Sequence, residues 1–542
     1  MGDGIIKTLF KNGIIIDGSG RPAYPGSVII SGSSIVEIAA GDYCSDFEGI
    51  IIDCKGLIVA PGFIDSHSHN DWFAASSNPV PYFKTFAEQG ITSQVVGNCG
   101  FSPFGYKADT PYKSMLGSGL FRVGDAEGDF SSYWGWKEAV QKRVPLNIIP
   151  LQGHGSIRIG LCGYENRALT AEETVLYNEK LEEAFEQGVF GLSFGLMYEP
   201  DRYATRDELE QSAGIVAKHG GILTVHGRAC SAASTSYSPP FVGRPHNLRA
   251  LEEMIELSRR TGVRLQYSHM IYVGESTWRT VDESLRLIDE ARREGLDISY
   301  DLYPMTFGVS VITVVLPNWF LSLPKEKRNS RLVRLRLAAE ISLTKKVLGF
   351  SFEDMMAAWI CDGKEELCNK RVSEIAAEWK VSPLDAYLRL VEMSEGKGRV
   401  NMYRYYNQQI ITKLIQHGPS LFMTDAWIEG KGVQNAAAYT AYPRFLELSR
   451  NGKGVSLEET VRKMSGAAAD RFKIIDRGYL HTGKAADITV FDAETVAAKG
   501  DLPERPVGIK HVFINGRHAV CEGVADEAIL LESGSILRPE AV

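Results

Sequence analysis

The sequence predicts an α/β protein built on a closed (β/α)8 TIM-like barrel, with a small β-sandwich domain formed by both termini and a helical insertion. From Gly62 onward, short apolar segments alternate with longer, charged, helix-like segments, which favours a parallel sheet. Eight such apolar segments can be counted, the number that closes a barrel. Both ends of the chain are instead rich in short β segments separated by turn residues.

The terminal segments are predicted to form one β-sandwich domain from residues 1–60 and 478–542, with the barrel occupying 61–477. The N-terminal part contains short β segments at 8–10, 13–17, 27–31, 35–38 and 50–53. The C-terminal part also has short β segments separated by turn residues. It includes GYLHTGKAADITVFD at 478–492 and VFINGRHAV at 512–520. We therefore expect the two parts to pair.

The predicted barrel strands are 62–69, 91–97, 147–152, 189–194, 222–226, 264–269, 297–303 and 420–425. The predicted helices between them include 170–187, 206–218, 247–260 and 280–294. About 120 residues separate the seventh strand from Asp425, which is too long for a structureless loop. Charged helical material at 325–346 and 353–380 indicates a helical insertion at about 311–419 that covers the active-site face.

Composition excludes several classes of protein. The 542 residues are 44% hydrophobic and 23% charged, as in ordinary globular proteins, and the net charge of −8 gives no basic surface for nucleic acid. No long apolar segment indicates a membrane span. The eight cysteines are too scattered for a disulfide scaffold. We expect a cytoplasmic protein that acts on a small molecule, binds neither nucleic acid nor membrane, and can form a homo-oligomer.

The segment LIVAPGFIDSHSHN at 57–70 carries the first chemical signal, because its strand ends in His67 and His69. Side chains alternate faces along a strand, so these two imidazoles point the same way and can bind one metal ion. Two histidines leave the coordination sphere incomplete. Alone, the pair is equally compatible with polar residues at a strand end.

Four further candidate residues fall at the ends of later strands, and together they indicate a metal centre: Cys99, His226, His269 and Asp425. Histidines and a thiolate can hold zinc while leaving a position open for water. A carboxylate such as Asp425 can accept a proton from that water and donate it to a leaving nitrogen. This combination predicts a hydrolase of an amide or related C–N bond.

Two other side chains have open interpretations. Arg228 lies two residues after His226, where its guanidinium could clamp a substrate carboxylate or form a structural ion pair. His154 follows the third strand, where it could support the pocket or hydrogen-bond to the backbone.

The sequence resembles the amidohydrolase superfamily in PGFIDSHSH, the NCG segment, the two single histidines, the late aspartate and GKAADITVFD. Within it, the chain resembles the N-acyl-D-amino-acid deacylases, or D-aminoacylases, in VVGNCGFSP, GHGSIR, GLSFGLMYEP and YDLYPMTFG. The resemblance implies a zinc-dependent enzyme that deacylates an N-acyl (D-)amino acid or a related linear amide.

The resemblance also implies roles for individual residues. Zinc would be bound tightly by Cys99, His226 and His269, and a second, weaker metal site would be formed by His67, His69 and the same cysteine. Asp425 would be the general acid/base. The remaining matches are Tyr303 and Ser310, which would line the substrate pocket, and Tyr198, on a loop expected near it.

Two positions depart from the family pattern. Cys230 stands where family members commonly carry an acidic residue, and Ile271 stands where they commonly carry a lysine. If that lysine binds the substrate, the usual N-acyl-D-amino acid is put in doubt, whereas the metal chemistry is not.

Two alternatives remain from the sequence. A cyclic amide hydrolase of the dihydroorotase or hydantoinase type typically uses a carboxylated lysine on the fourth barrel strand, and GVFGLSFGLMYEP contains no lysine. A noncatalytic scaffold with the same fold would be expected to have lost ligands, whereas all six candidate residues are present here.

Overall fold

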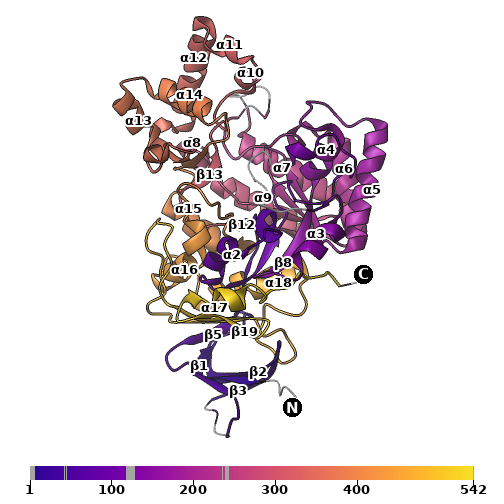
Figure 1. Cartoon of the computed structure of the whole chain (residues 1–542), viewed down its shortest axis with the longest axis vertical. Coiled ribbons are helices and arrows are strands. Elements are labelled where there is room, and N and C mark those ends of the chain that lie inside the picture. Colours follow the sequence, from indigo (N-terminus) through magenta and orange to yellow (C-terminus); the bar gives the residue numbers. More distant parts are fainter. Residues whose placement is uncertain are drawn as a thin grey trace.

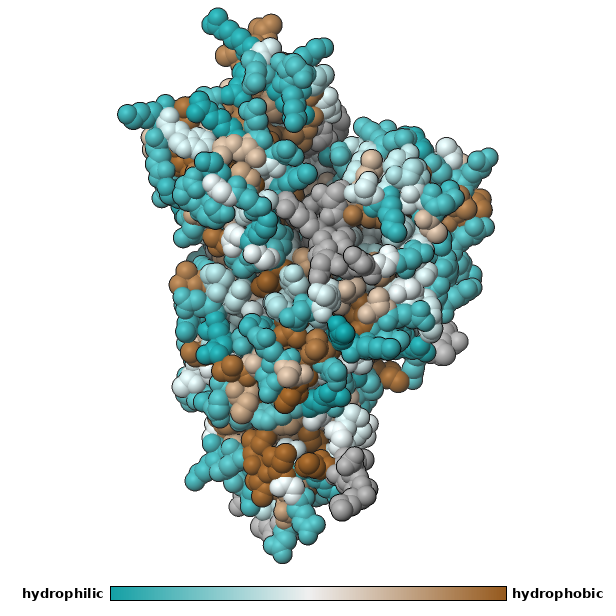
Figure 2. All heavy atoms as spheres, viewed as in Figure 1, coloured by the Kyte–Doolittle hydropathy of each residue, from teal (hydrophilic) through white to brown (hydrophobic). Residues whose placement is uncertain are grey.

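The computed structural model describes residues 6–41, 43, 46–116, 128–234, 236–237 and 243–540. It has three parts along its long axis: a strand-rich end, a central barrel and a lobe of helices at the opposite end (Figure 1). In this part of the chain, every helix is too short or too polar to cross a lipid bilayer. Figure 2 shows mostly hydrophilic residues on the viewed face, with hydrophobic residues gathered over the strand-rich end.

Eight parallel strands form the barrel, in the order in which they occur along the chain. They are β6 (Phe63–Asp65), β7 (Ile91–Val96), β8 (Asn147–Gly153), β9 (Gly191–Gly195), β10 (Ile222–His226), β11 (Arg264–Tyr267), β12 (Ile298–Leu302) and β16 (Ser420–Phe422). The first and last strands meet through the Ser66 amide, which donates to the Phe422 carbonyl at 3.4 Å, and a parallel bridge between Ser68 and Ala426. The predicted (β/α)8 fold is confirmed.

Helices surround the barrel and pack on its strands. The longer ones are α2 (Val80–Ala87), α3 (Tyr133–Val140), α4 (His154–Cys162), α5 (Ala171–Gln187), α6 (Arg206–Lys218), α7 (His246–Thr261), α9 (Val281–Arg293), α15 (Gln408–Gln416), α16 (Ala437–Arg450), α17 (Leu457–Met464) and α18 (Gly466–Phe472). Helix α5 shows how local sequence sets such bounds. The Thr170 hydroxyl accepts from the Glu173 amide and the Glu173 carboxylate accepts from the Thr170 amide, and Gly188, with φ 105°, ends the helix.

The barrel interior is closed at the amino ends of its strands by apolar packing. Ile64, Val95 and Leu421 from three strands cluster with Phe472 of α18 and Leu537 from the C-terminal segment. Because this end is filled, only the carboxyl ends of the strands are available for a site, as in other barrels of this type.

The termini form one nine-stranded sheet that encloses its own apolar core. Its strands are β1 (Lys7–Ile15), β2 (Tyr24–Ser31), β3 (Ser34–Ala40), β4 (Ile50–Asp53), β5 (Ile58–Pro61), β17 (Ile488–Phe491), β18 (Ile509–Ile514), β19 (Arg517–Cys521) and β20 (Val524–Ala525). The two halves of the chain join where β5 pairs antiparallel with β17. Phe10, Val28, Ile488 and Phe513 lie in the core between them. The predicted pairing of the two termini is confirmed.

The insertion after β12 contains helices and, in addition, a small antiparallel sheet that the sequence did not predict. Its elements are β13 (Gly308–Val311), α10 (Asn318–Leu321), α11 (Lys325–Arg328), α12 (Arg331–Leu348), β14 (Met355–Trp359), α13 (Val372–Trp379), α14 (Pro383–Met393) and β15 (Arg399–Met402). The central strand β15 pairs with β13 and β14. The domain boundaries given above stay predictions.

Candidate metal centre and substrate cavity

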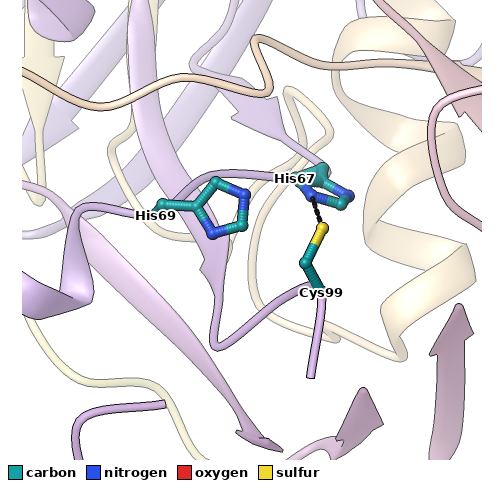
Figure 3. A group of neighbouring side chains, drawn as sticks. All are labelled: His67, His69 and Cys99. Carbon is teal, nitrogen blue, oxygen red and sulfur yellow. Dashed lines mark hydrogen bonds between the residues drawn. The ribbon is translucent and has the colours of Figure 1, made fainter. Parts of the chain in front are cut away.

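The thiol of Cys99 is the common neighbour of three histidines at the carboxyl ends of the barrel strands. Its Sγ atom lies 3.4 Å from His67 Nε2, 3.6 Å from His226 Nδ1 and 3.4 Å from His269 Nε2. Figure 3 shows His67, His69 and Cys99 converging, the first two from the end of β6 and the cysteine from the loop after β7. The donors group into two overlapping triads, Cys99 with His67 and His69, and Cys99 with His226 and His269.

This donor set fits zinc. A tetrahedral zinc ion with usual bond lengths holds its sulfur and nitrogen ligands about 3.6 Å apart, which matches the observed separations. All five side chains are buried, with at most 5% of the surface of any residue exposed. Burial lowers the pKa values of His67, His226 and His269, so their ring nitrogens keep free lone pairs. The shared cysteine can serve either triad.

The carboxylate of Asp425 faces the same cluster from the cavity side. Its Oδ1 atom lies 3.5 Å from both His67 Nε2 and His69 Nε2, and its backbone amide donates to the His67 carbonyl at 3.0 Å. Burial acts to raise the pKa of the Asp425 carboxyl group. His269, His69 and His67 outweigh that effect and hold this pKa below its usual range. The side chain is 24% exposed, far more than the histidines.

Backbone strain is concentrated in this cluster. Cys99, His269 and Asp425 have φ values of 54°, 32° and 48°, a region that residues with side chains rarely adopt. Gly100, with φ 82°, follows the cysteine because a Cβ there would lie 2.3 Å from an Asp201 carboxylate oxygen. Such strain persists only where surrounding contacts impose it, which is typical of functional sites.

Two buried aspartates hold the strained segments and were missed by the sequence reasoning. Asp301 on β12 accepts a hydrogen bond of 2.6 Å from the His269 amide, and Asp65 on β6 accepts from the Thr424 amide and hydroxyl and from Gln94. Burial raises the pKa of Asp301 to about 8 and that of Asp65 to about 7. Their signal in the sequence was an aspartate inside an otherwise apolar strand.

We expect Asp301→Ala to weaken zinc binding about 10–100-fold, because outer hydrogen-bond partners of metal ligands commonly contribute this much. The loss should appear as a higher dissociation constant in competition with a chelator. Asp301→Asn keeps an oxygen acceptor for the His269 amide and should restore much of the affinity. Asp289→Ala, on the surface beside His417, is the matched control. Equal zinc affinity in all four proteins would show that Asp301 does not position His269.

The Arg228 guanidinium is engaged by protein groups in this structure, and its predicted role in substrate binding stays a prediction. Its Nε atom donates to Glu253 at 2.9 Å, and its other nitrogens donate to the carbonyls of Arg202 and Ala204. It does not line the cavity next to the cluster. The guanidinium therefore connects the loop after β10 to α7 and to the segment before α6.

His154 also lies outside the cavity and belongs to a buried ion network. Its Nδ1 atom is 2.7 Å from Asp201, and its Nε2 atom is 3.2 Å from Glu208, which also pairs with Arg158. Burial opposes protonation, but the two carboxylates outweigh it and raise the pKa of His154 to about 9. The second Asp201 oxygen accepts from the Gly195 amide at the end of β9. The network thus stabilises the carboxyl end of β9.

This pKa predicts a stability change at alkaline pH. The folded-state value exceeds the usual 6.5, so the protonated His154 stabilises the fold fully below pH 6.5, and this contribution is lost as pH rises through 9. The shift corresponds to about 3 kcal/mol. The apparent melting temperature should fall between pH 7 and 9.5 more steeply for the wild type than for His154→Gln. His481→Gln, on the surface, should follow the wild type. Parallel pH profiles for all three would contradict the assignment.

A cavity of about 1030 Å³ opens above the cluster, between the barrel and the insertion. Tyr303, Ser310 and Tyr198 line it, and the Tyr198 ring contacts the His226 ring at a centroid distance of 4.5 Å. Ser310 reaches the cavity from β13, the first strand of the insertion. Cys230 and Ile271, the two departures noted in the sequence, also line the wall.

Comparison with known proteins agrees with the fold and the donor set. Residues 51–273 match the amidohydrolase family. The chain is 29% identical to N-acyl-D-glutamate deacylase and 28% identical to D-aminoacylase, both of Alcaligenes xylosoxydans xylosoxydans, in each case over 94% of this chain and 93% of the relative. In structure it superimposes on the N-acyl-D-glutamate deacylase of Bordetella bronchiseptica with a TM-score of 0.79, 25% identity and coverage of 99% and 100% of the two chains.

The chain therefore contains a segment similar to the amidohydrolase family, at residues 51–273. Over nearly its whole length it is similar to N-acyl-D-amino-acid deacylases, or D-aminoacylases, in sequence and in fold. The Bordetella structure contains zinc and a phosphonate inhibitor that mimics the tetrahedral intermediate of that enzyme's reaction. A dihydroorotase of Streptococcus pyogenes matches only 61 residues, 11% of this chain, and β9 carries no lysine.

Proposed function

We propose that this chain hydrolyses the amide bond of a linear N-acylated amine, with an N-acyl-D-amino acid that has an apolar side chain as the preferred substrate. The observation that supports it most is the convergence of one thiol, four imidazoles and one carboxylate at the open end of the barrel, facing a cavity large enough for a small molecule. The names of the full-length relatives support the linear, N-acylated class of substrate.

The residues of the cluster have two proposed roles, metal binding and proton transfer. Cys99, His226 and His269 would hold a zinc ion tightly, and His67 and His69 would form with the same thiol a second, weaker site. When bound, zinc supplies Lewis-acid activation of water and of the scissile carbonyl. Asp425 lies beside the donors and reaches the cavity, so its carboxylate can accept a proton from water and donate it to the departing nitrogen.

The proposed substrate preference follows from the polarity of the wall. Trp72, Tyr303, Met402, Tyr405 and Trp427 contribute buried aromatic or sulfur-containing surface to the cavity. Among the described residues that line it, the cations are Arg202, Lys345 and Lys397, and none of them is buried. A buried carboxylate on the substrate side chain would lack a partner here, which costs several kcal/mol. An apolar side chain has no such cost.

The residue at position 271 also favours a substrate with an apolar side chain. Family members commonly carry a lysine there, whereas in this chain an isoleucine lines the cavity two residues after His269. An aliphatic group adds contact surface for an apolar substrate and removes a charge that would bind an anionic one. The α-carboxylate would then be held nearer the rim, where Arg202 lies on the cavity wall.

A substrate panel tests the proposal. We expect zinc-loaded protein to release amine from N-acetyl-D-leucine, N-acetyl-D-methionine and N-acetyl-D-phenylalanine with kcat/KM at least 10-fold above that for N-acetyl-D-glutamate and N-acetyl-D-aspartate. The L enantiomers and cyclic amides serve as comparisons. Ile271→Lys should reduce this difference in kcat/KM by lowering KM for the acidic substrates. Preference for D-glutamate in the wild type would contradict the apolar assignment, and turnover of cyclic amides alone would favour the dihydroorotase-like alternative. Cytoplasmic location and homo-oligomerisation stay predictions.

A further inference from the structure

A second group of metal-binding side chains lies on the terminal sheet, in the hairpin of β18 and β19. His511 on β18 and Cys521 on β19 are direct cross-strand partners, and His518 on β19 stands opposite Phe513. A register shift between Val512 and Phe513 places an additional residue in β19. Residues three apart on a regular strand point to opposite faces, so the irregularity is what brings His518 and Cys521 to the same side.

The ligand atoms of this group are close enough to share one ion. The Nδ1 atom of His511 lies 3.2 Å from Nε2 of His518. Each of the three residues also offers one ligand atom, and these atoms lie within 4.8 Å of one another. Two nitrogens bound to one tetrahedral zinc ion lie about 3.3 Å apart. Imidazole nitrogen and thiolate sulfur are both zinc ligands, and three protein ligands leave a fourth position open to water.

The surrounding residues orient the two rings for binding. Glu522 Oε1 lies 3.6 Å from His511 Nε2, the nitrogen that does not face His518, as is usual for a ligating histidine with a carboxylate behind it. The Lys510 ammonium pairs with the other Glu522 oxygen at 3.5 Å. His518 stacks flat on Phe513 with a centroid distance of 4.3 Å.

We propose that His511, His518 and Cys521 bind a divalent ion of the zinc class, at a site on the terminal sheet that is distinct from the barrel cluster. The ion would join β18 to β19 near the β19–β20 turn and so fix the edge of the nine-stranded sheet. The competing interpretation is a simple N–H···N hydrogen bond between the two imidazoles. That bond would not involve Cys521, and this difference makes the two interpretations separable.

The test counts ions in the full-length protein. Wild type and Cys521→Ser are dialysed against the same buffered free zinc, and bound zinc is measured by mass spectrometry. Because Cys521 is exposed, its replacement by serine should leave the fold intact. We expect the variant to bind one equivalent less zinc, with unchanged amide hydrolysis. Cys361→Ser, at another surface-accessible cysteine, should match the wild type.

A second measurement tests whether the Cys521 sulfur binds the metal ion. In cobalt-substituted protein, the thiolate-to-cobalt absorption of Cys521→Ser should be weaker than that of the wild type, and the remaining band would arise from Cys99. His518→Gln should show the same loss of one equivalent, and His481→Gln should not. Equal zinc content and equal cobalt spectra in wild type and Cys521→Ser would overturn the proposal. The difference in zinc content between wild type and Cys521→Ser does not depend on the barrel site. A failed substrate assay would therefore not affect this result.

Discussion

Replacing Asp425 by asparagine is expected to reduce kcat about 10³-fold while leaving the zinc content unchanged. The side chain keeps its size and one oxygen, so the fold and the donors around Cys99 are preserved, but an amide cannot accept or donate the required proton. General acid–base groups typically contribute 10²–10⁴-fold, which sets the magnitude. Steady-state kinetics with the best substrate of the panel, together with zinc analysis, measure both quantities.

The matched control for that variant is Asp362→Asn. Asp362 pairs with Lys431 on the surface of the insertion and does not line the cavity. It should retain wild-type kcat and zinc content. Turnover within a few-fold of wild type for Asp425→Asn would remove this residue from the reaction. Loss of zinc in the same variant would instead make Asp425 chiefly a metal ligand.

Replacing Cys99 by serine is expected to abolish tight zinc binding and to lower kcat/KM by at least about 10³-fold. The sulfur contacts His67, His226 and His269 together, at 3.4–3.6 Å. A hydroxyl group is a poorer ligand than a thiolate for zinc, because its proton is much harder to remove. Zinc retained after dialysis against a chelator, and activity restored by added zinc, are the measurements.

Cys230→Ser provides the comparison for this variant. Cys230 also lines the cavity, and its sulfur lies 4.0 Å from the Nε2 atom of His226, on the side of the ring away from Cys99. Burial raises the pKa of Cys230 to about 12, so its thiol stays protonated. We expect near-normal zinc content and activity within several-fold of wild type. If the two serine variants lost zinc equally, the assignment of Cys99 as the shared ligand would be wrong.

The barrel could be predicted because its signal is local. Each strand is a short apolar run, and some of the helices between strands have a clear cap, such as Thr170 and Gly188 around α5. The proximity of the candidate residues could be predicted for the same reason, since each lies at the end of a strand or within three residues after it: His67, Cys99, His226, His269 and Asp425. The rule that parallel strands present their carboxyl ends on one face then places them together.

Three features could not be predicted in this way. Arg228 has the spacing of a cavity residue, but Glu253 and two carbonyl groups far along the chain bind its guanidinium. Asp301 reads as an ordinary residue within a strand until the fold brings the His269 amide to it. The sheet of β13, β14 and β15 joins segments separated by the whole insertion, and such pairing leaves little trace in local sequence.

Local patterns along the chain were sufficient to predict a barrel with metal-binding donors at its strand ends and a carboxylate beside them. The folded structure was needed to show which side chains share a cavity, which form ion pairs, and which residues make up the cavity wall above the cluster. The physical reason is that strand and helix formation depends on neighbours along the chain, whereas burial, hydrogen-bond partners and pKa values depend on neighbours in space. The His511, His518 and Cys521 group, created by a register shift in one hairpin, is an example of the second kind.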